Sequence, residues 1–394
     1  MIYLNNAATS FPKPECVIRA VSEFTTLPPM DAHRIAFADS GKSVVSSCRE
    51  KLAQLFSIDN PDNIAFTSGA THSVNMVIQG LDDIMGGHVI TTAIEHSSVL
   101  RALKLREKNG DLKLTVIDCN ECGEINALDI ENALTPETKA IIVNHASNVV
   151  GTAVDLEKIS DIAAREHIIL IVDASQTAGC IPIDVKRLGI DILIFTGHKS
   201  LFGFGGIGGV YINEELDVKP LIVGGTGVKT QSLYQTEERP LFYESGTQNT
   251  IGIASLEAGV SFILSEGIEK MAEKKEALYN KAIKGLASIP EVILYGNRKY
   301  STPIICFNIK KLKPVEVGYT LGKNFDIAVR SGLLCAPLIH EKLGTSPYGA
   351  VRASFSYFTE EEEIDLLVKA VSEMVEDVKR NKFVPIESYG VTCY

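Results

Sequence analysis

Lys199 stands in the stretch IFTGHKSLFGFGGIGGVYI, which contains no acidic residue to pair with its amine. The lysine follows an apolar run, residues 190–195, that predicts a buried strand, and a second apolar run comes at residues 208–212. We therefore expect Lys199 at the end of a sheet, where polar groups usually serve a site. An amine held there tends to lose its proton and become a nucleophile.

Asp173 and a small-residue turn add two further chemical groups. Asp173 directly follows the apolar run IILIV, so it either caps a turn or pairs with a buried cation such as a protonated ring nitrogen. In FTSGATHSVNMVI, residues 69–71 are expected to open a helix whose N–H groups and dipole hold a phosphate; plain N-capping by Ser68 or Thr71 is the alternative. Together with Lys199, these features match pyridoxal phosphate, which needs a Schiff-base lysine, an acid at its ring nitrogen and an anion site.

Alternating strands and helices are expected to position these groups. Apolar runs end in the turns of NIAFTSGAT, HVITTAIEHSS, AIIVNHASN, IILIVDASQT and ILIFTGHKS, and helix-like stretches such as HSVNMVIQGL and LEKISDIAAREH lie between them. The pattern predicts an α/β fold with a mainly parallel, doubly wound sheet, and places Lys199 one helical crossover after Asp173. Because ligands bind at the carboxyl ends of such strands, one pocket is expected to hold the polar groups that follow them: Ser68, His96, Asn148, Asp173 and Lys199.

The pattern changes from about residue 249. One long helix over residues 250–289 is expected to lead into short strands, TPIICFNI and YGAVRASFSYF, and a last helix in TEEEEIDLLVKAVSEMVEDVKRN. We predict a large cofactor-binding domain over residues 15–255 and a smaller C-terminal α/β domain over residues 256–394, with residues 1–14 packing near the latter.

Composition narrows the class of protein. The chain of 394 residues is 45% apolar and carries a net charge of −11, which argues against nucleic acid or an anionic membrane as a partner. Without a signal-peptide pattern or a run of about 18 apolar residues, a cytoplasmic location is expected. Cys119 and Cys122 form a C-x-x-C pair, but no second pair stands near them, so we expect free thiols and no metal site. Cys393 is expected to be a tail thiol, with a sulfur relay as the alternative.

Nearly the whole chain, from YLNNAAT to VRASFSYFTEEEEIDLL, resembles the class V aminotransferase-fold enzymes, which are pyridoxal-phosphate-dependent transferases of fold type I, like aspartate aminotransferase. It is most similar to the cysteine desulfurase and selenocysteine lyase family. The motifs that carry the resemblance are EHSSVL, HASNVVGT, VDASQTAG, TGHKSLFGFGGIGG, ESGTQN and RSGLLCAP. RSGLLCAP is similar to the short-loop type, although Leu333 and Leu334 stand where that type often has histidine, and Gln248 stands where the family often has proline.

The resemblance implies roles for individual residues. Lys199 would carry the cofactor, Asp173 would pair with its ring nitrogen, His96 would stack on the ring and Gln176 would bond its phenolic oxygen. The remaining cofactor contacts and the substrate contacts are implied for Ala70, Thr71, Thr196 and His198 (phosphate), Thr247 (phosphate of the other subunit of a homodimer), Arg352 (substrate carboxylate), Asn148 (beside it and the cofactor) and Arg330 (substrate side). Cys335 would take the sulfur, and the charge of Arg330 would favour its thiolate.

The activity implied is that of a cysteine desulfurase, which converts L-cysteine to L-alanine, leaves a persulfide on Cys335 and passes the sulfur to an acceptor protein. Within the same fold, a selenocysteine lyase or another lyase or aminotransferase is the alternative. A cofactor-bearing assembly partner with negligible activity of its own is the alternative of a different class.

Overall fold

The computed structural model describes residues 1–26, 43–229 and 231–385, so Cys393 lies outside the described residues. The helices are α1 (Glu15–Thr26), α2 (Val44–Phe56), α3 (Ala70–Gly80), α4 (Ser97–Lys108), α5 (Ala127–Asn132), α6 (Leu156–Glu166), α7 (Thr250–Glu266), α8 (Ile268–Ala287), α9 (Pro314–Phe325), α10 (Pro337–Lys342) and α11 (Glu361–Lys379). The strands are β1 (Ile2–Tyr3), β2 (Ile64–Thr67), β3 (His88–Thr92), β4 (Lys113–Ile117), β5 (Thr138–Asn144), β6 (Ile169–Asp173), β7 (Ile192–Thr196), β8 (Gly208–Ile212), β9 (Val292–Tyr295), β10 (Ile304–Ile309), β11 (Ile327–Ala328), β12 (Arg330–Gly332) and β13 (Ala350–Ser354).

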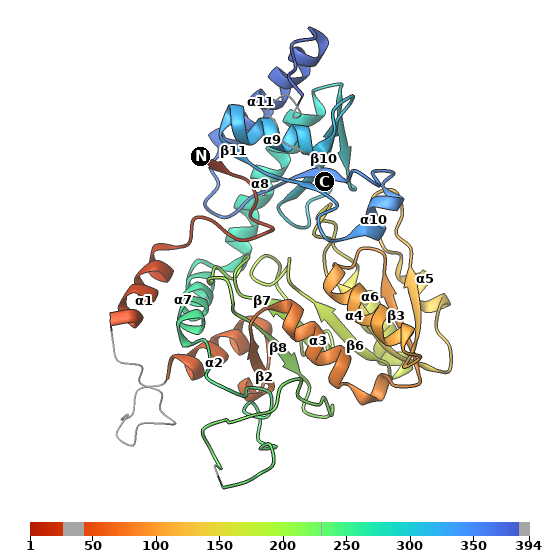
Figure 1. Cartoon of the computed structure of the whole chain (residues 1–394), viewed down its shortest axis with the longest axis vertical. Coiled ribbons are helices and arrows are strands. Elements are labelled where there is room, and N and C mark those ends of the chain that lie inside the picture. Colours follow the sequence, from red (N-terminus) through yellow and green to blue (C-terminus); the bar gives the residue numbers. More distant parts are fainter. Residues whose placement is uncertain (27–42, 230, 386–394) are drawn as a thin grey trace.

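A seven-stranded sheet in the order β2-β8-β7-β6-β5-β3-β4 lies at the centre of the larger part of the molecule (Figure 1). Only β8 runs antiparallel to its neighbours, so the expected mainly parallel sheet is confirmed. Alternate residues of the central strands enter different cores: Ile171 packs in the core that contains α3 and α4, and Val172 in the core that contains α2, α6 and α7. Coverage of both faces explains why these strands are continuous apolar runs.

The connection from β6 to β7 differs from the expected helical crossover. Residues 174–191 are all described, and they contain turns but no helix. Gly179 and Gly189 adopt positive φ angles of 76° and 53°, and Pro182 lies between them, which interrupts any helical hydrogen-bond ladder. The two strands still pair in parallel, with Asp173 opposite Ile194, so the turn that carries Lys199 begins beside Asp173.

The prediction of a single helix over residues 250–289 is also wrong. The structure has two helices, α7 and α8, which meet at Gly267 with a bend of 85°. Gly267 has a φ of 84°, a conformation that glycine adopts at little cost and that ends α7. The bend lets Ile263 of α7 pack in the core of the large sheet while Leu278 of α8 packs in a separate core. Of the described helices, no single one is long and apolar enough to cross a membrane.

The second core lies under a four-stranded antiparallel sheet in the order β12-β13-β10-β9, with α8, α9 and α11 around it (Figure 1). The first residues of the chain reach this region, because β1 pairs in parallel with β11. The predicted domain boundary between residues 255 and 256 falls inside α7, and it stays a prediction.

Candidate active site

A cavity of about 400 Å³ lies at the carboxyl ends of β6 and β7 and extends to β12 and β13. Its lining includes most of the residues proposed from the sequence: Ala70, Thr71, His96, Asn148, Asp173, Gln176, Thr196, His198, Lys199, Arg330, Cys335 and Arg352. Ser68 lines it too, so the five polar groups that follow strands do share one pocket. Thr247 is absent from the lining.

One end of the cavity is the start of α3. The N-cap residue is Gly69, and no side chain caps the helix, so the capping alternative by Ser68 or Thr71 is not observed. Gly69 has a φ of 144°, and a Cβ atom at Gly208 would come 2.7 Å from the Gly69 Cα atom, so the close approach of β8 to this turn requires glycine. The uncapped helix start, with Thr196 nearby, is suited to a phosphate group.

Lys199 and Asp173 lie on neighbouring strand ends in the middle of the cavity. Burial lowers the pKa of Lys199 to about 8; the charge of Asp173 opposes this shift and the charge of Arg352 adds to it. The Asp173 carboxylate is buried, and its Oδ1 accepts a hydrogen bond of 2.9 Å from the Ser175 amide. At neutral pH about a tenth of the Lys199 population is therefore the neutral amine, beside a carboxylate of fixed orientation.

His96 is the N-cap residue of α4. Its Nδ1 accepts a hydrogen bond of 3.1 Å from the Ser98 amide, so the neutral ring carries its proton on Nε2. Burial and the nearby charge of Lys199 lower the pKa of His96, which keeps the ring neutral. The ring is held in one orientation on the cavity wall, where it can stack on a planar ligand.

Arg352 provides a preformed cationic clamp on β13. Its Nη1 donates to the Asn148 carbonyl (2.7 Å) and its Nη2 to Asn5 Oδ1 (3.1 Å). Nε of Arg352 and Oδ1 of Asn148 are buried without a hydrogen-bond partner among the described residues. Arg352 also takes part in none of the ion pairs found among those residues. Burial lowers the pKa of Arg352 to about 10. A buried guanidinium with neutral partners and an open donor is suited to a carboxylate ligand.

Cys335 is exposed on the rim of the cavity, between β12 and α10. Its carbonyl oxygen accepts hydrogen bonds from the Ser97 amide (2.7 Å) and the Ser97 hydroxyl (2.9 Å), and the preceding carbonyl, of Leu334, accepts one from Asn148 Nδ2 (2.6 Å). Leu334 and Cys335 both have positive φ angles, 51° and 60°. These contacts hold the thiol at the opening, with the Leu334 side chain buried beneath it.

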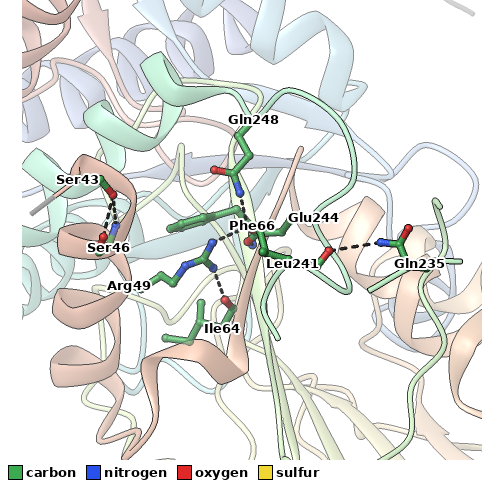
Figure 2. Close-up of polar contacts among 9 residues, drawn as sticks. All are labelled: Ser43, Ser46, Arg49, Ile64, Phe66, Gln235, Leu241, Glu244 and Gln248. Atoms are coloured by element: carbon green, nitrogen blue, oxygen red, sulfur yellow. Dashed lines mark hydrogen bonds and ion pairs between the residues drawn. The ribbon is translucent and has the colours of Figure 1, made fainter. Parts of the chain in front are cut away.

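Thr247 lies in a partly exposed segment that is anchored by a buried ion pair. Figure 2 shows Glu244 of this segment meeting Arg49 of α2, and the Gln248 side chain also donates to Glu244. Glu244 accepts a hydrogen bond of 2.6 Å from the Phe66 amide, and the Arg49 guanidinium lies 4.5 Å from the centre of the Phe66 ring. Gln248 therefore contributes to this anchor.

The N-terminal residues of the site were missed by the sequence argument. Ala7 and Ala8 line the cavity, and Asn5 binds Arg352. Gln176, proposed as a contact of the cofactor, also donates to the Ala7 carbonyl at 3.2 Å. Nothing local in YLNNAAT indicates these contacts, because the partners lie 169 and 347 positions away in the sequence.

Comparisons with known proteins agree with this geometry. Residues 2–367 match the family model Aminotransferase class-V. The chain is 32% identical to a probable cysteine desulfurase of Pyrococcus abyssi over 97% of this chain and 96% of the relative. An apo structure of cysteine desulfurase from Thermococcus onnurineus NA1 superposes with a TM-score of 0.87 at 32% identity, covering 95% of this chain and 94% of that one. The cysteine desulfurase CsdA from Escherichia coli gives 0.86 at 28%, with the same coverage. The chain therefore belongs to the class V aminotransferase family, in the group that includes the cysteine desulfurases.

Proposed function

We propose that this protein is a pyridoxal-phosphate-dependent cysteine desulfurase that converts L-cysteine to L-alanine and keeps the sulfur as a persulfide on Cys335. One observation carries the proposal: an exposed thiol, a desolvated lysine beside a carboxylate, and a buried arginine with an open donor line the same cavity. The names of the relatives support the choice of substrate.

The residues present fit the cofactor. Lys199 would hold it covalently, Asp173 would face its ring nitrogen, and the start of α3 with Thr196 and His198 would bind its phosphate. When bound, pyridoxal phosphate supplies an electron sink that weakens the bonds at the substrate's α-carbon. Burial and the charges of Lys199 and Lys13 lower the pKa of His198 to about 4, so His198 would meet the phosphate as a neutral donor.

The side chains then divide the work. Arg352 binds the substrate carboxylate through its guanidinium. Lys199 Nζ would move the proton at the α-carbon. Sγ of Cys335 would attack the substrate sulfur, so that an S–S bond forms as the bond between that sulfur and the β-carbon breaks. The bonding pair stays with the β-carbon, which takes up a proton and balances the one that the Cys335 thiol gives up; L-alanine leaves and the sulfur stays on Cys335 as a persulfide. A small thiol or an acceptor protein would take the sulfur from Cys335. We propose that the protein acts in the cytoplasm.

The assembly proposed is a homodimer in which Thr247 reaches the phosphate site of the other subunit. Thr247 does not line the cavity of its own chain, and its segment is anchored by the Arg49–Glu244 pair with apolar side chains such as Leu233 fully exposed nearby in the sequence. Clustered exposed apolar side chains are suited to a protein interface.

Mass spectrometry after incubation with L-cysteine tests the activity. The parent protein should gain one sulfur atom on the peptide of Cys335 and release alanine. The Cys335→Ala variant should bind the cofactor and form neither product, and Cys122→Ala, which removes a thiol outside the cavity, should behave as the parent. Release of sulfur by Cys335→Ala at the parent rate would replace this mechanism with a general lyase. Turnover of selenocysteine but not of L-cysteine by the parent protein would favour the selenocysteine lyase alternative.

A further inference from the structure

The N-terminal segment of residues 5–13 touches both halves of the catalytic cavity. On the side of the small sheet, Asn5 Oδ1 accepts from Arg352 at 3.1 Å, and the Ala7 amide donates to Ser354 Oγ at 2.9 Å. On the side of the large sheet, the Ala7 carbonyl accepts from Gln176 at 3.2 Å. The next residues reach the turn that carries Lys199, about 190 positions away in the sequence.

The carbonyl of His198 is the centre of this second contact. It accepts hydrogen bonds from the Ser10 amide (3.0 Å), Thr9 Oγ1 (3.1 Å), Ser10 Oγ (3.2 Å) and Lys13 Nζ (3.1 Å). This carbonyl belongs to the same planar peptide unit as the Lys199 nitrogen. The N-terminal segment therefore fixes the peptide from which the Lys199 side chain projects.

Lys13 uses all of its donors in this contact. Nζ donates to the carbonyls of His198 (3.1 Å) and Gly203 (2.7 Å) and to Ser10 Oγ (2.8 Å), and an ammonium has three N–H donors. His198 and Gly203 lie on either side of Lys199. The turn between them is closed by Phe202 N to Lys199 O (2.9 Å) and Gly203 N to Gly197 O (2.8 Å).

The free-energy cost of burying the Lys13 ammonium argues that this side chain does more than fill space. The acceptors of Lys13 are neutral, and burial lowers its pKa to about 8, so holding the ammonium here costs folding free energy. An apolar side chain would fill the space without that cost. A carbonyl clamp on both sides of one residue gives a geometric reason to keep a cation in this place.

We propose that Lys13 is a positioning residue: its ammonium binds the carbonyls of His198 and Gly203 and so holds the turn that directs Lys199 into the cavity, from the same N-terminal segment that holds Arg352. This inference rests on the proposed function, in which Lys199 carries the cofactor and moves the proton. Lys13 touches neither cofactor nor substrate in this role.

Lys13→Met tests the proposal, because it keeps the length and apolar stem of lysine and removes the three donors. Lys13→Arg keeps the charge and several donors, and Lys104→Met, which removes an exposed lysine of α4, controls for loss of surface charge. Amide hydrogen exchange of residues 197–204 is measured in the cofactor-free proteins, together with the rate at which added pyridoxal phosphate attaches to Lys199. Turnover of L-cysteine is measured in the reconstituted proteins.

Lys13→Met should exchange these amides about tenfold faster, as expected for the loss of one or two hydrogen bonds. Attachment to Lys199 should slow by a similar factor, and kcat should fall about tenfold with KM within about twofold, since Arg352 stays bound. Lys13→Arg should recover most of each loss. Unchanged exchange, or faster exchange with unchanged attachment and kcat, would overturn the proposal. If the parent does not turn over L-cysteine, the proposed function fails. The rate at which pyridoxal phosphate attaches to Lys199, together with amide exchange, then decides whether Lys13 is a positioning residue. If Lys13→Met does not fold, Lys13→Gln replaces it in the same measurements.

Discussion

Desolvation disfavours the charged forms of two groups: the Lys199 amine, which lines the cavity, and the Glu95 carboxyl, which lies outside the lining next to His96 in the sequence. The pKa of Lys199 falls to about 8 and that of Glu95 rises to about 8, in both cases mainly because burial penalises the charged form. Asp173 raises both values, since its negative charge favours the ammonium and disfavours a second carboxylate. Asp173 therefore favours the charged form of Lys199 and the neutral form of Glu95, while burial remains the larger cause of both shifts.

The reactivity of Lys199 should follow its lowered pKa. In cofactor-free protein, the rate of covalent attachment of added pyridoxal phosphate should rise with pH, with a midpoint of about 8, well below the 10.5 of an ordinary lysine, and level off about one to two pH units above that midpoint. Asp173→Asn removes the charge that favours the ammonium, so its midpoint should move lower. A midpoint near 10.5 in the parent, measured by absorbance against pH, would contradict the desolvated amine.

Glu95 should make the protein less stable as the pH rises. Its Oε1 accepts from the Asn144 amide (2.8 Å), and its Oε2 is buried without a partner among the described residues. Because the folded pKa, about 8, lies above the ordinary 4.5, the folded state binds more protons than the unfolded state between these values. This group therefore lowers the free energy of unfolding as pH rises from about 4.5 to about 8, at up to about 1.4 kcal/mol per pH unit.

Urea unfolding of the cofactor-free parent and Glu95→Gln at several pH values in that window isolates the effect. Glutamine copies the neutral acid, so the two proteins should have similar stability at the acidic end, and the variant should become the more stable one toward pH 8. Other titrating groups, such as His145, whose pKa burial lowers to about 4, contribute equally to both proteins and cancel in the difference. A difference that does not change with pH would show that Glu95 is ionised when buried.

At the scale of the elements, the sequence predicted features that have a local pattern and missed those that depend on tertiary contacts. The strands that end in Asp173 and Thr196 were predictable because continuous apolar runs with a glycine-rich or polar end are a local signal. The break at Gly267 was missed because the residues on both sides favour helix. The glycine was a local stop signal, and the packing of α7 and α8 against different cores fits the bend that it allows. Local signals also placed most of the site at the correct edge of the sheet.

The remainder of the site depends on contacts between distant segments. Ser97 fixes the Cys335 carbonyl from 238 positions away, and Arg352 meets Asn5 across 347 positions. No spacing rule connects such pairs, because neither residue lies in a repeating element shared with the other. Lys13 is a similar case, since FPKP indicates only a turn before a helix.

The Arg49–Glu244 pair should be the main anchor of the segment that carries Thr247. The side chains of Arg49 and Glu244 are 6% and 1% exposed, and Glu244 also accepts from Phe66 and Gln248. Glu244→Ala leaves the guanidinium buried without its counter-charge, which typically costs about 3–5 kcal/mol. Gln248→Ala removes one neutral donor and should cost about 1 kcal/mol. The free energies of unfolding in urea measure both.

A double variant separates the charge pair from packing. Replacing both partners, as Arg49→Met with Glu244→Met, removes the pair without stranding either charge, so it should be more stable than Glu244→Ala. If Glu244→Ala stays within about 1 kcal/mol of the parent, the ion pair is not the anchor proposed here. Water reaching Arg49 in the variant would then be the physical reason.

At the scale of the whole molecule, the cavity joins elements that no single layer supplies. Lys199 and Asp173 come from the large sheet, Arg352 and Cys335 from the region of the small sheet, and residues 5–13 connect the two. Relative movement of the two sheets would thus change the distance between the substrate clamp and the lysine. The one predicted site residue that lies outside this cavity, Thr247, is the one proposed to serve a second chain.

Complementation between two inactive chains tests that shared site. In a homodimer whose sites each combine Lys199 of one chain with Thr247 of the other, a Lys199→Ala chain mixed with a Thr247→Ala chain forms one intact site and one doubly altered site. A homodimer of either single variant has no intact site. Refolded mixtures should therefore recover alanine production from L-cysteine. The recovery should reach up to about a quarter of the parent level, because random pairing makes half of the dimers mixed and each mixed dimer has one intact site of two.

Mixing Lys199→Ala with Lys199→Ala,Thr247→Ala is the matched control, because it leaves no lysine in any site and should stay inactive. A mixture no more active than the Thr247→Ala chain alone, with mixed dimers verified by native mass spectrometry, would place Thr247 outside the reaction.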